Sequence, residues 1–541
     1  MTDNGTETFD YVIVGAGSAG SLLASRLAET PGVRICLLEA GPKDRNPFIH
    51  IPAGFIKVIF DPKLTWGFET EPNATINDRV LPVLQGRVVG GSSSINGMVY
   101  VRGQAQDFDS WAKAGNADWS YNDVLPYFRR TECLLTDGDS RYRGSEGKMP
   151  VTHLQWKNEL VSAFIEASSN IGLPPNDDYN GARQEGVGVY QYNIGRGRRQ
   201  GTAQAYLRDS LRGGAIDLRT HARATELVFE GSRVSGVRYT TDKGHTTQTV
   251  SANCEVILCG GAINTPRLLQ VSGIGDPDHL AEIGAPAINK LPGVGQNLRD
   301  HYTPRFTCRV EGAVTVNEIV RGPRMISEGV RWLFHRPSIL TNGPVMGVAF
   351  CKSDSSIDRP DLVITFTPGS FKEGFLGKLD SVPGMTLGTW QLRPESTGYV
   401  RAKSRDLFEA PAIQPNYLSA EKDQNVVVAG QKIIRRILSD SAMAPYSVEE
   451  VMPGKDVQDD DALLDYARRQ GLGGYHYCGT CRMGAKDDAG AVVDARLKVH
   501  GLEGLRVVDA SVMPNIVSGN INAATMMIAE RAAEFIREDR D

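Results

Sequence analysis

Tyr11-Val12-Ile13-Val14-Gly15-Ala16-Gly17-Ser18-Ala19-Gly20 is the most informative stretch of the chain. Its first four residues form an apolar run of strand length, typical of a strand buried on both faces of a parallel sheet. The glycines lead into a helical pattern that ends before Pro31-Gly32. A second apolar run, residues 33–38, ends at Glu39. The segment therefore predicts a complete β-strand–helix–β-strand unit.

The glycine spacing in this unit is that of a dinucleotide-binding turn. Gly15 permits the tight turn, Gly17 lets the backbone approach a pyrophosphate, and Gly20 allows close packing of helix on strand. The N-terminus of the helix offers free N–H groups to the phosphates. Glu39 follows at about the 20-residue distance expected of an acid that accepts hydrogen bonds from the adenosine ribose hydroxyls. FAD and NAD share this pattern, so the motif alone does not choose between them.

Composition excludes several classes of protein. The chain has 541 residues, of which 41% are hydrophobic and 23% charged, with a formal net charge of −5. The acidic balance argues against a nucleic-acid partner, and no apolar run is long enough to predict a membrane span. The polar, acidic start lacks the pattern of a signal peptide, and the eight cysteines are sparse, as in reduced proteins. We therefore expect a cytoplasmic location. The sequence carries no signal for the oligomeric state.

The middle of the chain predicts a second domain. Short β-type segments dominate from about residue 304 to 400, with a helix expected near Met325–Phe334, which together indicate a mostly antiparallel sheet. Nucleotide-domain signals return at Glu255–Gly261 and Leu505–Ala510, so that domain is assembled from separated segments. The expected strands are Arg305–Val310, Val345–Phe350, Leu362–Phe366, Met385–Leu392 and Tyr399–Ala402. The basic run Arg196–Arg199 is expected to be a solvated loop.

Residues 86–103, GRVVGGSSSINGMVYVRG, closely resemble the first signature of the glucose–methanol–choline (GMC) oxidoreductases. Residues 261–275 resemble the second signature, and residues 295–301, 393–398 and 507–531 also fit. The resemblance implies an FAD enzyme, an alcohol oxidase or dehydrogenase similar to choline dehydrogenases or aryl-alcohol oxidases. It implies an α/β fold, a Rossmann-like FAD-binding domain (1–155, 196–303 and 465–541) with an inserted α+β substrate domain (156–195 and 304–464).

The resemblance also implies which residues hold FAD. Small residues in the 90–97 loop let the backbone lie against the flavin ring, and Ala224 matches the position whose backbone meets the adenine. Some members attach FAD covalently through a His in this loop, where this chain has Ile95, so we expect non-covalent FAD. The implied FAD-binding residues are Gly15, Gly17, Ser18, Ala19, Gly20, Glu39, Ala40, Arg87, Val89, Gly91, Ser92, Asn96, Gly97, Met98, Val99, Ala224, Gly261, Asp509, Ala510, Asn520 and Ile521.

Residues 475–484, YHYCGTCRMG, resemble the family segment that supplies the catalytic base, here His476. The family's second catalytic position, His or Asn, falls on Asn520. A neutral imidazole is able to take a hydroxyl proton near neutral pH, and Asn520 is expected to hydrogen-bond the same oxygen. The alternatives are a core histidine with satisfied hydrogen bonds and an asparagine that caps the helix expected at Ala523–Ile536.

The segment departs from the family at Tyr477, where proline is usual, and at Cys478. Cys478 and Cys481 form a C-x-x-C, but no second ligand pair or thioredoxin-like context accompanies them, so we expect no metal site. Tyr477 and Trp390 are expected in the substrate pocket. Three other aromatic residues, Phe350, Phe366 and Trp332, are weaker candidates.

These observations favour an oxidoreductase that converts a primary, aromatic or apolar alcohol to an aldehyde and passes the electrons to O₂ or to a quinone-type or artificial acceptor. A hydroxynitrile lyase-like or other non-redox member of the family is the alternative. A photodecarboxylase ranks lower, since Leu392 stands where that enzyme has Cys and His476 is present. A flavin-binding protein without activity is disfavoured by the His476 and Asn520 pair.

Overall fold

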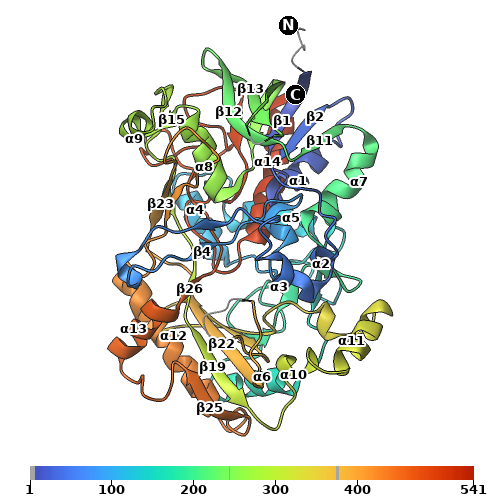
Figure 1. Ribbon diagram of the computed structural model, residues 1–541, viewed down its shortest axis with the longest axis vertical. Coiled ribbons are helices and arrows are strands. Elements are labelled where there is room, and N and C mark those ends of the chain that lie inside the picture. The colour runs from blue at the N-terminus through green and yellow to red at the C-terminus, as the bar shows by residue number, and fades with distance from the viewer. Residues whose placement is uncertain (1–6, 243, 373–376, 541) are drawn as a thin grey trace.

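The computed structural model describes residues 7–242, 244–372 and 377–540. Its larger sheet lies in the upper half of Figure 1. The central strand β1 (Glu7–Val14) runs parallel to β2 (Ile35–Glu39) on one side and β14 (Thr247–Leu258) on the other. β11 (Ile216–Thr220) extends the sheet beyond β2, and β27 (Leu505–Val507) pairs with β14 in parallel. The predicted strand–helix–strand unit and its assembly from distant segments are therefore confirmed.

Two helices cover one face of this sheet. α1 (Ser18–Leu27) follows the glycine turn, and α14 (Asn522–Arg540) packs along it, in red beside blue in Figure 1. Arg26 of α1 forms an ion pair with the buried Glu530 of α14 at 2.9 Å. A Cβ on Gly20 would lie 1.9 Å from the carbonyl oxygen of Gly15. Helix α1 therefore reaches its strand only because residue 20 has no side chain.

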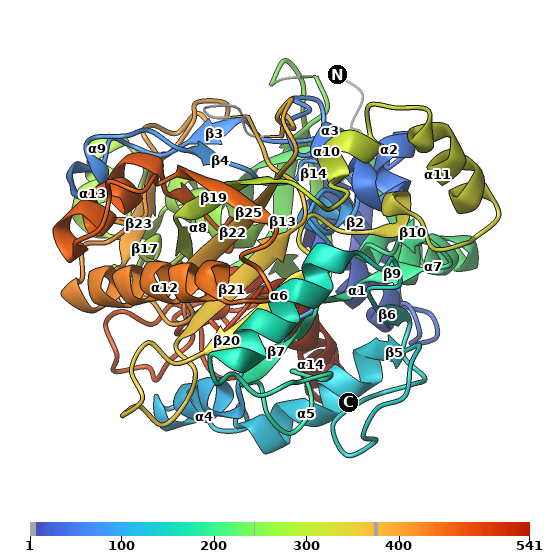
Figure 2. The same ribbon diagram turned by 90° about the horizontal axis from the view of Figure 1, so that it is seen from below.

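The second large sheet is antiparallel and has six strands in the order β25-β19-β22-β21-β20-β7. Helices α6 (Glu159–Asn170) and α12 (Glu421–Ser439) cover its outer face, as Figure 2 shows. The strands are β7 (Gly186–Val189), β19 (Arg305–Val310), β20 (Gly347–Cys351), β21 (Leu362–Thr367), β22 (Gly384–Gln391) and β25 (Ser447–Met452).

Side chains alternate between the two faces of this sheet, as the period of two requires. Apolar residues such as Phe306, Ile364 and Leu387 pack under the helices. Their neighbours Thr365 and Trp390 line a cavity on the other face. One face of the sheet thus builds the core of the second domain, and the other is free to form a site.

Two sequence expectations are corrected here. The strand expected at Tyr399–Ala402 forms as β23 (Gly398–Arg401), but it pairs with β17 (Gln296–Leu298) and β24 (Ala412–Gln414) in a separate sheet. Arg199, expected in a solvated loop, is 1% exposed. Its guanidinium donates to the carbonyl oxygen of Asn96 at 2.6 Å and to the Asn96 side chain at 2.8 Å. A buried arginine therefore holds the 93–96 loop in place through hydrogen bonds from within the core.

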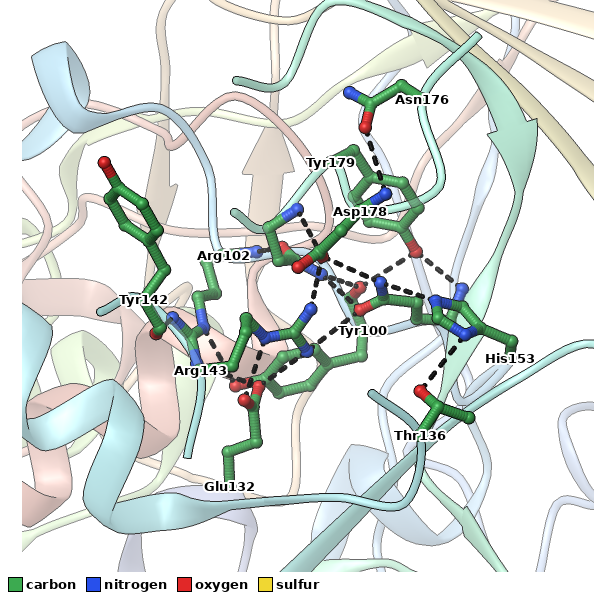
Figure 3. Close-up of polar contacts among 12 residues, drawn as sticks. Tyr100, Arg102, Glu132, Thr136, Tyr142, Arg143, His153, Asn176, Asp178 and Tyr179 are labelled. Atoms are coloured by element: carbon green, nitrogen blue, oxygen red, sulfur yellow. Dashed lines mark hydrogen bonds and ion pairs between the residues drawn. The ribbon is translucent and has the colours of Figure 1, made fainter. Parts of the chain in front are cut away.

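A buried polar network joins segments of the two predicted domains (Figure 3). Both carboxylate oxygens of Glu132 accept hydrogen bonds from Arg143 at 2.9 Å, and Arg102 pairs with the same carboxylate at 2.8 Å. Burial alone would raise the pKa of Glu132, but the two guanidinium groups hold it below its usual value. Arg143 also reaches Asp178, which lies in the segment predicted to belong to the substrate domain. The domain boundaries themselves stay a prediction.

Within the described residues, no helix is both long and apolar enough to cross a membrane.

Several shorter elements complete the architecture. These elements include α2 (Pro47–His50), η1 (Pro52–Gly54), α3 (Phe55–Val58), α4 (Ala105–Lys113), α5 (Tyr121–Thr131), α8 (Gly261–Val271), α11 (Arg324–Leu333), η6 (Ile339–Thr341), α13 (Asp460–Gln470), β12 (Arg223–Glu230) and β13 (Arg233–Thr240).

Candidate active site

A cavity lies between the carboxyl ends of the parallel strands and the inner face of the six-stranded sheet. Val14, Leu38 and Leu258, at or near the ends of β1, β2 and β14, form part of its wall. Ligands of open α/β sheets bind at this edge, where the strand order reverses. The opposite wall comes from β19, β21 and β22. One cavity therefore joins the dinucleotide motif to the second domain.

Glycine backbone forms the end of the cavity next to β1. Gly15 has a φ of +104°, and Gly91 has a φ of +53°. A Cβ on Gly91 would lie 2.7 Å from the Cα of Gly17, so the two glycine turns approach each other with no room for side chains. Nearby, the amide nitrogen of Asn264 is buried without a partner among the described residues. A narrow cradle with an unpaired polar atom fits a large flat cofactor.

Two buried carboxylates stand in this half. Glu39 accepts the N–H groups of Ala16 at 3.0 Å and Gly41 at 2.8 Å. Burial raises the pKa of Glu39 to about 7. Asp509 accepts from the N–H of Gly261 at 2.8 Å and from the hydroxyl of Thr265 at 2.6 Å. Backbone N–H groups and the Thr265 hydroxyl therefore hold the two acids, and both acids line the cavity.

Most of the predicted FAD-binding residues meet in this cavity, but three do not. Gly20 packs against Gly15, Arg87 stacks over Trp66 and donates to the carbonyl of Pro62, and Val89 is buried in the core. The predicted residues in the wall are Gly15, Gly17, Ser18, Ala19, Glu39, Ala40, Gly91, Ser92, Asn96, Gly97, Met98, Val99, Ala224, Gly261, Asp509, Ala510, Asn520 and Ile521, together with His476, Tyr477 and Trp390.

His476 and Asn520 come together at the other end of the cavity. The amide nitrogen of Asn520 lies 2.8 Å from Nε2 of His476. Asn520 precedes α14 by two residues, so its side chain serves the histidine and the site rather than the helix. Burial, and then the neighbouring His301, lower the pKa of His476 well below its ordinary value. The ring is therefore neutral at neutral pH.

His301 was missed as a site residue, although it ends the motif at residues 295–301. Its Nδ1 lies 2.9 Å from Nδ1 of His476, and its Nε2 lies 3.0 Å from the carbonyl oxygen of Leu392. A carbonyl only accepts, so Nε2 of His301 carries the proton. Burial lowers the pKa of His301 to about 4, which keeps that ring neutral and its Nδ1 a lone pair.

This pairing fixes the tautomer of His476. Because Nδ1 of His301 accepts, the proton between the rings belongs to Nδ1 of His476. Nε2 of His476 therefore carries the lone pair, which accepts a hydrogen bond from the amide of Asn520 at the cavity wall. The structure presents a neutral base with its accepting nitrogen aimed at the site.

The backbone beside both residues is also held. The carboxyl of Asp300 accepts the N–H of His476 at 2.6 Å and the hydroxyl of Tyr417 at 2.6 Å. Asp107, in α4, accepts the N–H of Ser518 at 2.7 Å and its hydroxyl at 2.9 Å, two residues before Asn520. These contacts come from segments far apart in the sequence, and no local sequence motif predicted them.

The chamber in front of His476 is largely apolar. Trp390 and Tyr477 lie in its wall, as predicted. The weaker candidates do not: Phe350 and Phe366 are core residues, and Trp332 lies in α11, where its indole nitrogen donates to Gly197. The sequence did not predict several other residues of the cavity wall, which are Phe55, Ile56, Ile59, Phe60, Trp66, Arg305, Pro344, Val345, Phe371 and Tyr475.

Cys478 and Cys481 are both buried with free thiols. Burial raises the pKa of both thiols above the usual value. Among the described residues, no group of His, Cys, Asp and Glu is arranged to hold a metal ion. The pair therefore packs in the core behind Tyr477.

Comparison with known proteins agrees with this architecture. Family models described as GMC oxidoreductase match residues 9–303 and 394–529. The chain is a GMC oxidoreductase. It is 41% identical to the alcohol dehydrogenase [acceptor] of Pseudomonas putida over 98% of this chain and 95% of that one. It is 38% identical to human mitochondrial choline dehydrogenase over 98% and 90% of the two chains.

Solved structures share the fold over nearly the whole chain. Pyridoxine 4-oxidase from Mesorbium loti aligns with a TM-score of 0.87 and 31% identity over 97% of this GMC oxidoreductase and 98% of that chain. A formate oxidase of Aspergillus oryzae aligns with a TM-score of 0.92 and 25% identity over 98% of both chains. This member of the family is thus an FAD-dependent oxidoreductase that acts on CH–OH donors. Nothing in these comparisons favours the lyase alternative.

Proposed function

We propose that this GMC oxidoreductase oxidises a neutral, apolar primary alcohol to an aldehyde, with His476 as the base. The observation that supports this proposal most strongly is the neutral His476 ring, whose Nε2 lone pair lies at the cavity wall. A histidine held in this state takes a hydroxyl proton without first losing one of its own. Asn520, at 2.8 Å from the same nitrogen, is placed to donate to the alcohol oxygen.

The chain's own residues account for the movement of the proton. The hydroxyl proton goes to Nε2 of His476, and the imidazolium so formed still donates through Nδ1 to His301. His301 in turn stays anchored on the carbonyl of Leu392. When FAD is bound, it supplies the hydride acceptor. The residues proposed to hold it are the wall residues of the glycine cradle, with Glu39 at the ribose and Asp509 beside Gly261.

The walls of the chamber indicate the substrate class. Phe371 and Trp390 offer apolar surface, whereas the acids of the cavity wall, Glu39 and Asp509, stand at the cofactor end. Arg305 brings a positive charge to the chamber. A like charge disfavours a cationic alcohol such as choline, although choline dehydrogenases are among the relatives. A neutral alcohol fits these walls better.

We further propose that FAD is bound without a covalent link. The loop position from which some family members attach the cofactor is occupied by Ile95, whose aliphatic side chain is 2% exposed and has no nucleophilic atom. Denaturation with hot acid is expected to release all the yellow colour into the supernatant. Colour retained in the pellet would overturn this assignment.

The electron acceptor is proposed to be O₂ or a quinone-type compound. The names of the relatives point both ways, since one is an alcohol dehydrogenase [acceptor] and another an oxygen-dependent choline dehydrogenase. Oxygen uptake measured beside reduction of a quinone-like dye, at equal enzyme concentration, separates the two.

The decisive test is anaerobic stopped-flow mixing of His476→Ala with a panel of alcohols. Loss of the base is expected to slow bleaching of the bound flavin by about 10²-fold or more, the usual weight of general-base catalysis, while FAD stays bound. His245→Ala, an exposed histidine, is the matched control. An unchanged rate in His476→Ala would remove this residue from the mechanism. Faster bleaching by choline than by hexanol or benzyl alcohol would overturn the substrate class.

A further inference from the structure

Helix α11 (Arg324–Leu333) exposes a row of apolar side chains to solvent. Its side chains Ile326 and Leu333 are 73% and 68% exposed, and Phe334, the next residue, is 73% exposed. On the side toward the protein, the buried Glu328 accepts the N–H of Ile339 at 2.7 Å, and the half-buried Trp332 donates its indole N–H to the carbonyl of Gly197 at 2.8 Å. Helices of globular proteins normally direct their apolar residues to the core. This helix also presents an apolar row to solvent.

The exposed apolar residues form a single face. Ile326, Val330, Leu333 and Phe334 are spaced four, seven and eight residues from the first, which puts them on one side of a helix. Scattered apolar side chains are common on protein surfaces. A contiguous row of exposed apolar side chains on one face of a helix is less common, and such a patch marks a site of association. We call these four side chains the α11 face.

The α11 face is flanked by positive charge. Residues 321–336 contain four arginines and one acidic residue, the buried Glu328, in a chain whose net charge is −5. Arg331 lies 3.8 Å from Glu328. Within the described part of the chain, Arg324 and Arg336 form no ion pair. Exposed Leu and Phe, a half-buried Trp332 and several arginines are the composition of a helix that lies in a lipid interface.

We propose that the α11 face docks on an anionic lipid surface, with its apolar row among the acyl chains and its arginines at the phosphates. A second copy of this chain is the competing occupant. A symmetric contact would place the same arginines of two copies together, since each patch would meet itself. Anionic headgroups neutralise these charges instead, so the charge pattern selects lipid.

The position of α11 gives this docking a consequence for the site. α11 packs on η6, which packs on η1, and η1 leads directly into α3. Phe55 and Ile56 of α3 line the cavity. Figures 1 and 2 both place α11 beside α2 and α3, and Phe48 of α2 is also exposed. Docking through the α11 face therefore brings the α3 side of the cavity close to the bilayer.

Sedimentation with lipid vesicles tests the proposal on the whole FAD-loaded enzyme. Binding is expected to vesicles of phosphatidylcholine mixed with phosphatidylglycerol, to weaken strongly on phosphatidylcholine alone, and to fall as salt is raised. Ile326→Ser combined with Leu333→Ser should weaken binding about tenfold or more. Arg324→Gln, Arg331→Gln and Arg336→Gln together should weaken it about a hundredfold.

Leu135→Ser combined with Val448→Ser is the matched control, because both side chains are 53% exposed on other elements. This control should bind vesicles as the wild type does. Alcohol oxidation with a soluble dye should be equal in all variants, which shows that each is folded. Failure of the wild type to bind anionic vesicles, or equal loss in the control, would overturn the proposal. A dimer in solution that Ile326→Ser and Leu333→Ser dissolve would assign the face to a second copy instead.

Discussion

At the β1 end of the cavity the wall is largely backbone, whereas at the β22 end it is mainly side chain. The first end places Gly15 and Gly91 where any Cβ would collide with backbone and where φ is positive. The second end relies on His301, His476 and Asn520, each held by a hydrogen bond to the next. A wall of backbone binds one cofactor shape and supplies no group that takes part in the reaction. A set of side chains gives the chemistry and is open to change.

The two ends are therefore expected to fail differently when they are altered. Damage to the glycine end should remove the cofactor and stability together. Damage to the side-chain end should leave a folded, yellow protein with slower chemistry. Each of the following changes is directed at one end.

Gly20→Ala is expected to have the largest effect. The new Cβ would lie 1.9 Å from the carbonyl oxygen of Gly15, so α1 must move away from the sheet. Loss of bound FAD is expected, with a fall in the free energy of unfolding of about 3 kcal/mol or more. Flavin absorbance and thermal unfolding measure both. Gly213→Ala, where a Cβ meets nothing within 4 Å, is the control, and retained FAD in Gly20→Ala would contradict the account.

His301→Ala should slow the chemistry while FAD stays bound. Without the acceptor at Nδ1, His476 is free to place its proton on Nε2, and flavin reduction by alcohol should slow by about tenfold to a hundredfold. The unfolding temperature should also fall, because His301 is fully buried and its truncation leaves a cavity. His301→Asn keeps an acceptor oxygen near the same position and should recover most of the rate. Equal losses in Ala and Asn variants would show a packing role alone.

Arg305→Met sharpens the account of the substrate end. Removal of the positive charge should raise kcat/KM for choline relative to hexanol by about tenfold, the size of one like-charge repulsion at an intermediate dielectric constant. Competition between the two alcohols in one assay gives this ratio directly. The rate with hexanol alone is expected to stay within about twofold. An unchanged ratio would show that Arg305 does not face the substrate.

The pH dependence should be the mildest effect. Burial lowers the pKa of His476 below 6.5, so the ring is neutral, and active, over the whole neutral and alkaline range. kcat/KM should be level above about pH 6.5 and fall toward acid as Nε2 becomes protonated. The lowered pKa of His476 also makes the fold more stable at pH values above the pKa that His476 has in the unfolded chain. That contribution is lost as the pH falls through the pKa of His476 in the folded protein. A rate that rises steadily from about pH 7 to pH 9 would contradict a neutral base.

Sequence alone predicted the backbone end more fully than the side-chain end. Gly15, Gly17 and Glu39 were predicted from a dinucleotide turn, which is local and contiguous, and the 91–99 loop was predicted from its resemblance to the family signature; all of them line the cavity. Gly20 was also found, but its contact is with Gly15 rather than with the cavity. Of the five strands expected in the antiparallel sheet, only β23 lies in another sheet, because its partners depend on long-range pairing. The alternation of side chains between the two faces of β19 to β22 is visible in the sequence. It does not predict which face borders a cavity.

At the side-chain end of the cavity, the sequence predicted only His476, Asn520, Trp390 and Tyr477. His301 lies 175 residues from its partner His476, and Asp107 lies 411 residues from Ser518. Periodicity carries no information on such pairs, because they depend on how two domains pack. Arg199 shows the same limit: a run of arginines is usually solvated, yet this one supports Asn96 from inside the core.

The span of the cavity wall has a consequence for the order of events during synthesis. The wall uses residues from Val14 near one end of the chain to Thr525 near the other, and β27 and α14 complete the sheet and the helix layer around the glycine turn. The ribosome releases the glycine turn first and these partners last. The glycine turn is thus synthesised hundreds of residues before the cavity wall is complete. The complete cavity wall is therefore present only once Thr525 and the residues before it have been synthesised.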